Sequence, residues 1–266
     1  LYSTQAAISS LAPVIAPLVG GQLLLLGDWH VVFIFLTGLG AAVLAMAAWL
    51  MPETLPVEKR TMLSFKTTFA SWGEIFHDRR FVPLAITGGL LFGQVCVFIA
   101  GAPFALQEGF HLTPTEYTYA FAAVTIVMFS ANAINRSLLK RFASVNLLRY
   151  GLSQAIFAAL FMTVMNIFNI HTLATSIIGF ALSISAMGFC MANMLGLAMR
   201  DHAARAGTAA GLIGFTNSLG GAIAAPLTSL FFGLDIVGVT LFMSILLVTA
   251  AVVGLYGIRN EKAVVH

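Results

Sequence analysis

Long, nearly uninterrupted apolar stretches constrain this chain more than any other feature. A transmembrane α-helix needs about 20 consecutive, mostly apolar residues, and eight stretches are long enough. Because a bilayer offers backbone N–H and C=O groups no hydrogen-bond partner, each stretch is expected to be a helix. The sequence therefore predicts an all-α, polytopic transmembrane helix bundle with spans at residues 4–26, 31–51, 81–106, 117–139, 146–168, 172–199, 207–232 and 236–258.

The composition agrees with a membrane location. Only 9% of the residues are charged and 59% are hydrophobic, whereas soluble domains carry roughly 25% charged residues. The net charge of +3 comes from basic residues scattered over the connections, without the basic stripe of a nucleic-acid-binding surface. The composition thus predicts the lipid bilayer as a partner and excludes nucleic acid.

The positions of the basic residues predict the orientation. With eight spans drawn, all 13 Lys and Arg residues fall on one side, near residues 59–80, 136–149, 200–205 and 259–262. The Asp and Glu residues of the opposite connections are Asp28, Glu108, Glu116 and Asp235, and these connections carry no Lys or Arg. By the positive-inside rule, the basic side is cytoplasmic. We therefore expect a multi-pass protein of the bacterial inner membrane with both ends of this chain in the cytoplasm.

The longest connection, residues 52–80, is expected to be a cytoplasmic linker that contains an amphipathic helix. Pro52 and Pro56 end the preceding span. Aromatic residues then recur at helical spacing, at Phe65, Phe69, Trp72 and Phe76. Such a helix can lie in the membrane interface or bind a partner, and the sequence leaves both open.

The first span carries a stripe of small residues with two prolines. Ala12, Ala16 and Gly20 are four residues apart and allow the backbone of another helix to approach closely. Pro13 and Pro17 free backbone carbonyls and bend the helix. The stretch therefore indicates a tightly packed seam that can bend.

Residues 16–21, Ala-Pro-Leu-Val-Gly-Gly, resemble the antiporter motif of the major facilitator superfamily, with Ala16 in place of a Gly and Gly21 at its end. Residues 52–55 are similar to the Pro-Glu-Thr ending of that family's sixth span. Residues 100–108 and 205–209 resemble the end of the seventh and the entry to the eleventh span in its bicyclomycin/chloramphenicol-resistance (Bcr/CflA) branch.

The resemblance implies that this chain covers the fifth to twelfth of twelve spans. Residues 1–51 would be the last two spans of the N-terminal half, residues 81–258 the C-terminal six-helix half, and residues 259–266 a cytoplasmic tail. The missing partner would be the first four spans of the same protein.

The resemblance also implies a secondary active transporter, a proton-coupled antiporter that exports drugs or small metabolites. A facilitator or an importer of another small solute is the alternative. A membrane-embedded enzyme is less favoured, because no nucleophile–base pair, phosphate loop or His/Cys metal spacing is present. A scaffold is less favoured because it does not account for the seam with two prolines. We therefore expect no enzymatic activity, no cofactor and no metal site, and a small-molecule substrate and protons as partners.

Uncharged polar residues inside the spans are the candidates for a substrate cavity. Each needs a hydrogen-bond partner in hydrocarbon and is expected to face the bundle interior. The alternative for each is an interhelical hydrogen bond, worth about 0.6 kcal/mol on average. The candidates are Thr87, Gln94, Asn132, Asn135, Asn193, Thr216 and Asn217.

Charged residues at the span ends suggest two further roles. Residues 135–141 resemble a cytoplasmic loop motif of the superfamily, although its Asp is missing. This resemblance suggests a gate formed by Arg136, Lys140, Arg141 and Arg205, with lipid-headgroup anchoring as the alternative. Asp28 and Glu108 are the candidate proton carriers, unless they are merely solvated and the carrier lies in the missing spans.

The predicted topology can be tested at His111, which falls in a connection on the side opposite the basic residues. A cysteine introduced at position 111 should react with a membrane-impermeant maleimide added from outside. Reaction from the cytoplasmic side alone would refute the topology.

Overall fold

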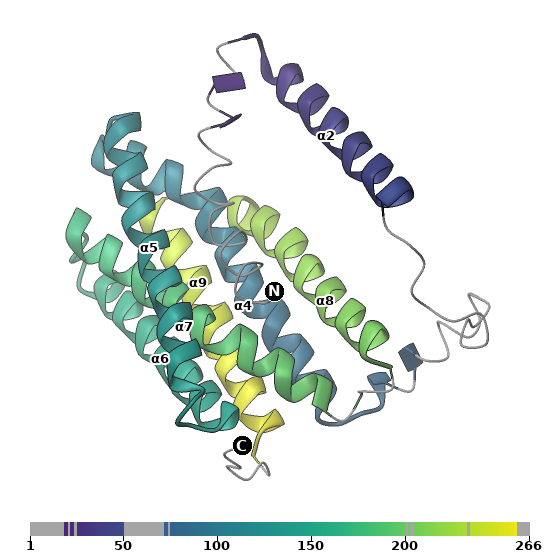
Figure 1. The fold of residues 1–266 in the computed structure, drawn as a ribbon. Helices are drawn as coiled ribbons and strands as arrows, with labels where there is room; N and C mark the ends of the chain where they lie inside the picture. The colour runs from purple at the N-terminus through teal and green to yellow at the C-terminus, as the bar shows by residue number, and fades with distance from the viewer. Residues whose placement is uncertain are drawn as a thin grey trace. The chain divides into compact units, whose positions relative to one another are not determined.

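A computed structural model describes residues 19–20, 22–23, 26–50, 72–73, 75–200, 202, 205–232 and 235–259. The chain divides into two units, residues 1–63 and residues 64–266, which are considered separately. Figure 1 shows the helices with their labels.

The first unit contains one described helix, α2 (Trp29–Leu50), which matches the second predicted span. Asp28 stands at its start, where its carboxylate accepts hydrogen bonds from the backbone N–H of His30 (3.1 Å) and from the His30 ring (2.8 Å). The span predicted at residues 4–26 lies mostly outside the described residues.

The second unit is a bundle of six long helices. Their bounds are α4 (Phe81–Pro103), α5 (Pro114–Leu138), α6 (Ser144–Ile167), α7 (Leu173–Arg200), α8 (Ala206–Leu227) and α9 (Ile236–Gly257). With α2, seven described helices are long and apolar enough to cross a membrane. The all-α polytopic bundle is thus confirmed, with seven of the eight predicted spans.

Local sequence signals explain where several helices begin. Thr113 and Glu116 form a capping box at the start of α5, with Pro114 in the first turn. This signal starts the helix three residues before the predicted boundary, because proline suits the first helical position. Asp235 caps α9 by accepting a hydrogen bond from the backbone N–H of Gly238 (2.9 Å).

Two helices end in π-helical turns that follow a proline. Pro103 precedes η2 (Phe104–Glu108), and Pro226 precedes η4 (Thr228–Phe232). Proline removes a backbone donor and disturbs the regular hydrogen-bond ladder. The buried hydroxyl of Thr228 donates to the carbonyl of Ala224 (2.9 Å), so one of the carbonyls near the second proline gains a partner.

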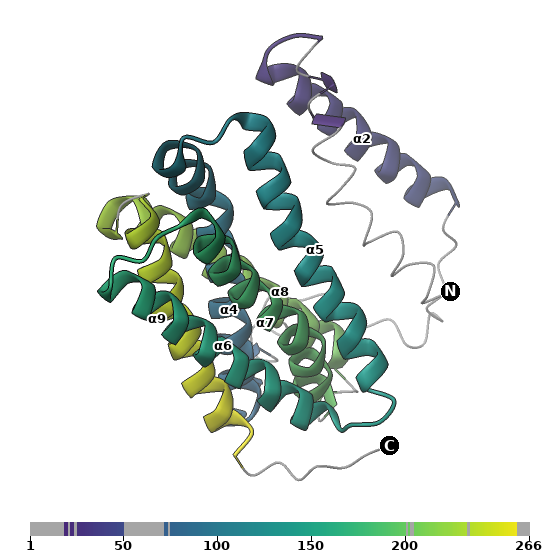
Figure 2. The ribbon, with the colours of Figure 1, turned by 90° about the vertical axis from the view of Figure 1, so that its left-hand side faces the viewer.

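In chain order the six helices form two triplets, α4–α6 and α7–α9, and the first helix of each triplet packs mainly on the last two helices of the other. Helix α4 packs mainly on α8 and α9, whereas α7 packs mainly on α5 and α6. Helices α6 and α9 also pack on each other, and α4 meets α7 at the centre of the bundle. Figures 1 and 2 show this arrangement from two directions. Each triplet therefore depends on the other for its packing.

The described part of the linker packs on the same bundle. Ile75 is fully buried, and the ring of Trp72 lies 6.2 Å from that of Phe215 on α8. Trp72 of the predicted apolar face thus contacts protein, whereas Phe76 of the same face is 48% exposed. Phe65 and Phe69 lie outside the described residues.

Glycines bring the backbones of α4 and α8 into direct contact. A Cβ on Gly89 would lie 2.7 Å from the carbonyl oxygen of Thr216, and one on Gly93 would lie 3.0 Å from that of Gly220. A Cβ on Gly220 would overlap the backbone of Gly89. We call Gly89, Gly93 and Gly220 the glycine seam; small residues permit this close approach in membrane bundles.

The glycine seam generates a prediction. Gly220→Ala should destabilise the bundle by about 1–3 kcal/mol, because backbone atoms of α4 must move to make room. Gly214→Ala is the matched control on the same helix, since a Cβ there would meet nothing within 4 Å. Thermal unfolding of both variants in detergent measures the difference. Equal stability of the two would mean that the seam does not limit the packing.

Candidate functional site

Two of the predicted cavity residues, Gln94 and Asn217, lie where α4, α7 and α8 meet. The buried Gln94 side chain donates from Nε2 to the carbonyl of Ser183 on α7 (3.4 Å). Asn217 is half-buried, and its Nδ2 lies 3.8 Å from Sδ of Met191 on α7. Asn217 also lies against α4, because a Cβ on Gly88 would be 2.7 Å from its Oδ1.

A second pair of predicted residues, Asn135 and Asn193, links α5 to α7. Nδ2 of Asn193 donates to Oδ1 of Asn135 (2.7 Å) and to the carbonyl of Phe189 (2.7 Å). Both side chains are buried, with exposures of 1% each. This pair is an interhelical hydrogen bond, although one oxygen of Asn193 remains available.

The amide oxygens of three of these residues are buried without a partner. Among the described residues, Oε1 of Gln94 and Oδ1 of Asn193 and Asn217 accept no hydrogen bond. A buried acceptor without a partner costs about 1–3 kcal/mol, and native structures usually satisfy such groups with protein or water. These oxygens are therefore free to accept hydrogen bonds from N–H or O–H groups.

The other three predicted residues have different surroundings. Thr87 is fully buried and donates to the carbonyls of Pro83 (2.8 Å) and of Ala250 on α9 (3.4 Å). Thr216 is half-buried and donates to the carbonyl of Leu212 on its own helix (2.8 Å). Asn132 is exposed on α5. Of these three, Thr216 adjoins Asn217 on α8, and its Cγ2 atom lies 3.1 Å from the position of a Cβ on Gly89 of α4.

A groove that the sequence did not indicate lies on α5, α6 and α7. Its volume is about 540 Å³, and its polar lining includes Ser130, Tyr150, Ser153, Gln154 and Ser185. Nε2 of Gln154 donates to Oγ of Ser185 (2.5 Å) and to the carbonyl of Leu182 (3.3 Å). The polarity criterion applied to the other spans would also have identified Gln154.

The four residues predicted to form a gate lie on the surface. Arg136, Lys140, Arg141 and Arg205 are all exposed. Instead, half-buried Arg149 of α6 donates to the carbonyl of Ile258, at the C-terminal end of α9 (3.4 Å). A cation is favoured there by the helix dipole. From the sequence alone, Arg149 indicated only the orientation of the chain in the membrane.

A His–Asp pair at the same end connects two segments that are far apart in the sequence. Nε2 of His202, after α7, lies 2.8 Å from Oδ2 of Asp78, before α4. Both side chains are largely buried, with exposures of 16% and 25%. The His202 ring also packs edge-on against Phe81, at 5.4 Å between centroids. The pair therefore joins the start of α4 to the connection between α7 and α8.

Hydrogen bonds determine the ionisation of Asp78. Burial raises the pKa of this carboxyl, but hydrogen bonds from the backbone of Arg80 and from the His202 side chain outweigh burial. The pKa of Asp78 therefore lies below its ordinary value, and the carboxylate is the favoured form.

The remaining predicted residues are exposed or outside the described part of the chain. Asp28 contacts His30 at the start of α2, and Glu108 is at the end of η2; both are exposed. Their role as proton carriers stays a prediction. Of the predicted antiporter motif the structure describes only Gly20, so Ala12, Pro13, Ala16, Pro17 and Gly21 lie outside the described residues.

Comparison with known proteins identifies a family and several relatives. The sequence model of the Major Facilitator Superfamily matches residues 1–225. The chain is 29% identical to the uncharacterized MFS-type transporter YdgK of Bacillus subtilis, over 98% of this chain and 65% of that protein. It is 21% identical to the bicyclomycin resistance protein homolog of Haemophilus influenzae (86% and 57% covered) and 28% identical to multidrug resistance protein D of Escherichia coli (82% and 54% covered). The chain thus spans about half to two thirds of the length of these relatives.

The His202–Asp78 pair generates a prediction. A double-mutant cycle of Asp78→Asn and His202→Asn, measured by thermal unfolding at pH 7, should give a coupling of about 0.5–1 kcal/mol. A folded-state pKa below the unfolded value of 3.8 means that Asp78 contributes stability above that value. This contribution is lost as the pH falls through the folded-state pKa.

The pair His30–Asp28 is the matched control, because it has the same 2.8 Å contact but its side chains are 59% and 65% exposed, respectively. Asp28 and His30 lie in one turn, so the coupling energy that the unfolding experiment measures for this pair should be near zero. Equal couplings for the two pairs would contradict a role of His202–Asp78 in holding the bundle together.

Proposed function

The chain belongs to the Major Facilitator Superfamily, and we propose that, with the four N-terminal spans that the motif resemblance implies, it forms a proton-coupled antiporter that exports drugs or small metabolites. The membrane would be the bacterial inner membrane, with both ends of this chain in the cytoplasm. The names of two relatives, a bicyclomycin resistance protein homolog and multidrug resistance protein D, support a drug-like substrate.

The observation that carries the proposal is the pair of unpartnered amide oxygens on Gln94 and Asn217. Gln94 lies on α4 and Asn217 on α8. Both face α7, near the middle of long apolar helices. In transporters of this kind, the substrate site lies near the bilayer midplane between the two halves. An acceptor that the bundle leaves unsatisfied can gain a hydrogen bond from a substrate N–H or O–H group.

Methionines beside these amides suit a site that accepts varied molecules. Met191 contacts Asn217, and the end of the Met194 side chain lies 2.5 Å from the position of a Cβ on Gly88. Thioether side chains are flexible and polarizable, so they can adapt to ligands of different shape. The proposed site therefore combines a few directional acceptors with an adaptable apolar wall.

The carboxylates available to carry a proton lie near the ends of the spans. Among the described residues of the second unit, the acidic side chains in candidate spans are Glu108 and Glu116, both near helix ends. We propose that the proton is carried by Glu108 or Asp28, or by a carboxylate in the four implied N-terminal spans. Efflux that is insensitive to the pH gradient would favour a facilitator, and inward accumulation would favour an importer.

The proposal predicts the effect of two substitutions in the full-length protein. Gln94→Leu and Asn217→Leu should each change the KM for chloramphenicol or ethidium efflux by about three- to tenfold, since one net hydrogen bond is worth about 0.5–1.5 kcal/mol. The measurement is pH-gradient-driven efflux in everted vesicles, normalised to the amount of protein.

The control is Thr249→Val, because Thr249 is exposed on α9 and its hydroxyl donates only to the carbonyl of Ile245 on its own helix. This variant should transport both probes normally. If the two amide variants lowered the amount of protein but left the KM of both probes unchanged, Gln94 and Asn217 would be packing residues.

A further inference from the structure

The groove formed by α5, α6 and α7 is large enough to hold part of another molecule. Helices α5 and α6 both pack on α7 but make little contact with each other, so α7 forms the floor between them. The α5 wall extends from Val127 to Ile134 and the α6 wall from Tyr150 to Phe157, which is about 10 Å of helix in each case. The volume of about 540 Å³ lies within the range of about 300–1,000 Å³ that small-molecule sites occupy.

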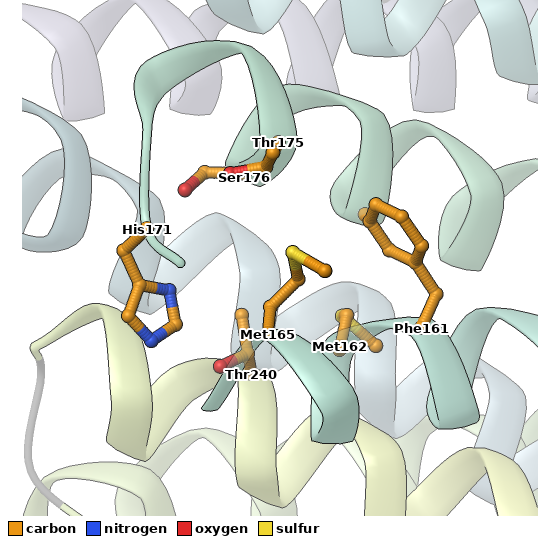
Figure 3. Close-up of a pocket in the computed structure, with 8 residues that line it drawn as sticks. Phe161, Met162, Met165, His171, Thr175, Ser176 and Thr240 are labelled. Atoms are coloured by element: carbon orange, nitrogen blue, oxygen red, sulfur yellow. The ribbon is translucent and has the colours of Figure 1, made fainter. Parts of the chain in front are cut away.

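A second hollow, beyond the other end of α6, is too small for such a ligand. It lies where α6 connects to α7, and Figure 3 shows Met162, Met165, His171 and Thr240 among the residues that line it. Its volume is about 10 Å³, which is enough for roughly one water molecule. Of these two hollows, only the groove on α5, α6 and α7 can therefore take a larger occupant.

The groove offers a mostly apolar surface, because most of its polar groups already have partners. Gln154 donates from Nε2 to Oγ of Ser185 (2.5 Å) and to the carbonyl of Leu182 (3.3 Å). Ser130 donates to the carbonyl of Ile126 on its own helix (2.8 Å). The large apolar side chains of the lining come from all three helices and are Val127, Ile134, Phe157, Leu182 and Phe189. Such a surface fits a hydrocarbon chain better than a polar solute.

The walls of the groove are exposed on the surface of the second unit. The side chains of Ile134, Tyr150 and Phe157 are 51%, 56% and 58% exposed. Helices α5, α6 and α7 are each long and apolar enough to cross a membrane, so apolar side chains exposed along them are suited to contact with lipid. A lipid chain can thus enter the groove from the side.

A basic residue follows the groove at one end. The α5 lining residues recur at steps of three and four from Val127 to Ile134, so they share one face of the helix. The same steps lead to Leu138 and then to Arg141, which is exposed in the turn after α5. The backbone N–H of Arg141 donates to the carbonyl of Leu138 (2.9 Å), so the turn continues the path of the helix. Arg141 therefore lies about 10 Å beyond Ile134 along the axis.

The stretch of chain that forms the groove is basic and carries no carboxylate. From residue 117 to residue 200 the sequence contains no Asp or Glu. Its Lys and Arg residues are Arg136, Lys140, Arg141, Arg149 and Arg200. Basic pockets between transmembrane helices bind anionic lipid headgroups. A zwitterionic headgroup also carries an ammonium group, for which this stretch offers no carboxylate partner. The charge of the stretch therefore favours an anionic headgroup.

We propose that the groove binds one anionic phospholipid from the leaflet beside the α5–α6 connection, with an acyl chain between α5 and α6 and the phosphate at Arg141. The headgroup region of one leaflet is about 5–8 Å thick, so a phosphate above the groove is within reach of the Arg141 side chain. The site requires only that the chain spans a membrane, and it does not depend on the proposed transport.

Tyr150 is placed to contact the same lipid. Its ring packs edge-on against Phe189, with 5.0 Å between centroids, and so forms part of the wall. It lies at the end of the groove nearer Arg141, because α6 begins at Ser144, just after the turn that contains Arg141. Tyrosine combines an apolar ring with a polar hydroxyl and is enriched at the membrane interface. Its hydroxyl can donate to an ester or phosphate oxygen of the lipid.

The headgroup preference is tested by native mass spectrometry of the purified full-length protein in detergent. The protein is titrated with phosphatidylglycerol or with phosphatidylethanolamine that has the same acyl chains, and phosphatidylglycerol should bind more tightly. Arg141→Gln should weaken phosphatidylglycerol binding about fivefold, because one basic residue near the membrane surface contributes about 1 kcal/mol toward an anionic lipid. Binding of phosphatidylethanolamine should not change.

Arg136→Gln is the matched control for the charge. Arg136 is also exposed, but it follows Ile134 by two residues and therefore lies on the opposite side of α5 from the groove. This variant should bind phosphatidylglycerol as the wild-type protein does. Equal affinity of the wild-type protein for the two lipids, or equal effects of Arg141→Gln and Arg136→Gln, would overturn the proposal.

The position of the acyl chain is tested with phosphatidylglycerol that carries a photoreactive diazirine in that chain. Crosslinks mapped by mass spectrometry should fall on the α5 and α6 walls. Ser153→Phe should abolish them, because Ser153 is an exposed residue of the lining and a phenyl group there fills the groove. Leu160→Phe is the matched control, since Leu160 is 57% exposed on α6 but outside the groove.

Thermal unfolding without added lipid verifies that the four variants keep the fold. Crosslinks that avoid both walls in the wild-type protein would also overturn the proposal. That result is expected if a second copy of the chain or the four implied N-terminal spans cover the groove. Crosslinks that persist in Ser153→Phe as in Leu160→Phe would show that the acyl chain lies outside the groove.

Discussion

The contact between the backbones of α4 and α8 is the constraint on which the rest of the bundle depends. In lipid there is little hydrophobic gain from bringing helices together, so close packing and interhelical hydrogen bonds must hold them. The glycine seam allows the two backbones to touch, and α4 can then also reach α9 and α7. Larger residues at the seam would separate α4 from α8 and disturb the surroundings of both Gln94 and Asn217.

Polar residues in this bundle differ in whether the bundle satisfies all of their hydrogen-bonding groups. Thr87, Thr216 and Asn135 form hydrogen bonds within or between helices and need nothing further. Gln94 and Asn217 use their amide nitrogen atoms toward α7 but leave their oxygens unpartnered. A residue that only held helices together would gain from satisfying both groups. An amide with one free, buried acceptor is better explained by a mobile occupant, either water or substrate.

The sequence predicted those features that depend on local chemistry. Hydropathy located all seven described helices, because a span must be long and apolar whatever its neighbours are. Hydropathy did not predict which face of α5 is buried. The structure shows Asn132 exposed and Asn135, one turn later, buried. Nor could it predict the contact between His202 and Asp78. These residues are 124 positions apart in the sequence and meet only when the first helix of each triplet packs on the other triplet.

The two ends of the bundle are held by different kinds of interaction. At the end with the basic connections, the Asp78–His202 pair and the contact of Arg149 with Ile258 join segments through charged groups. At the other end, caps hold the helix starts locally, because the Thr172 hydroxyl, the Glu116 carboxylate and the Asp235 carboxylate each accept a backbone N–H within the same turn. Partly exposed polar contacts between segments can exchange protein partners for water at low cost. In the proposed transporter, separating the segments that these contacts join at the basic end would therefore change the energy little.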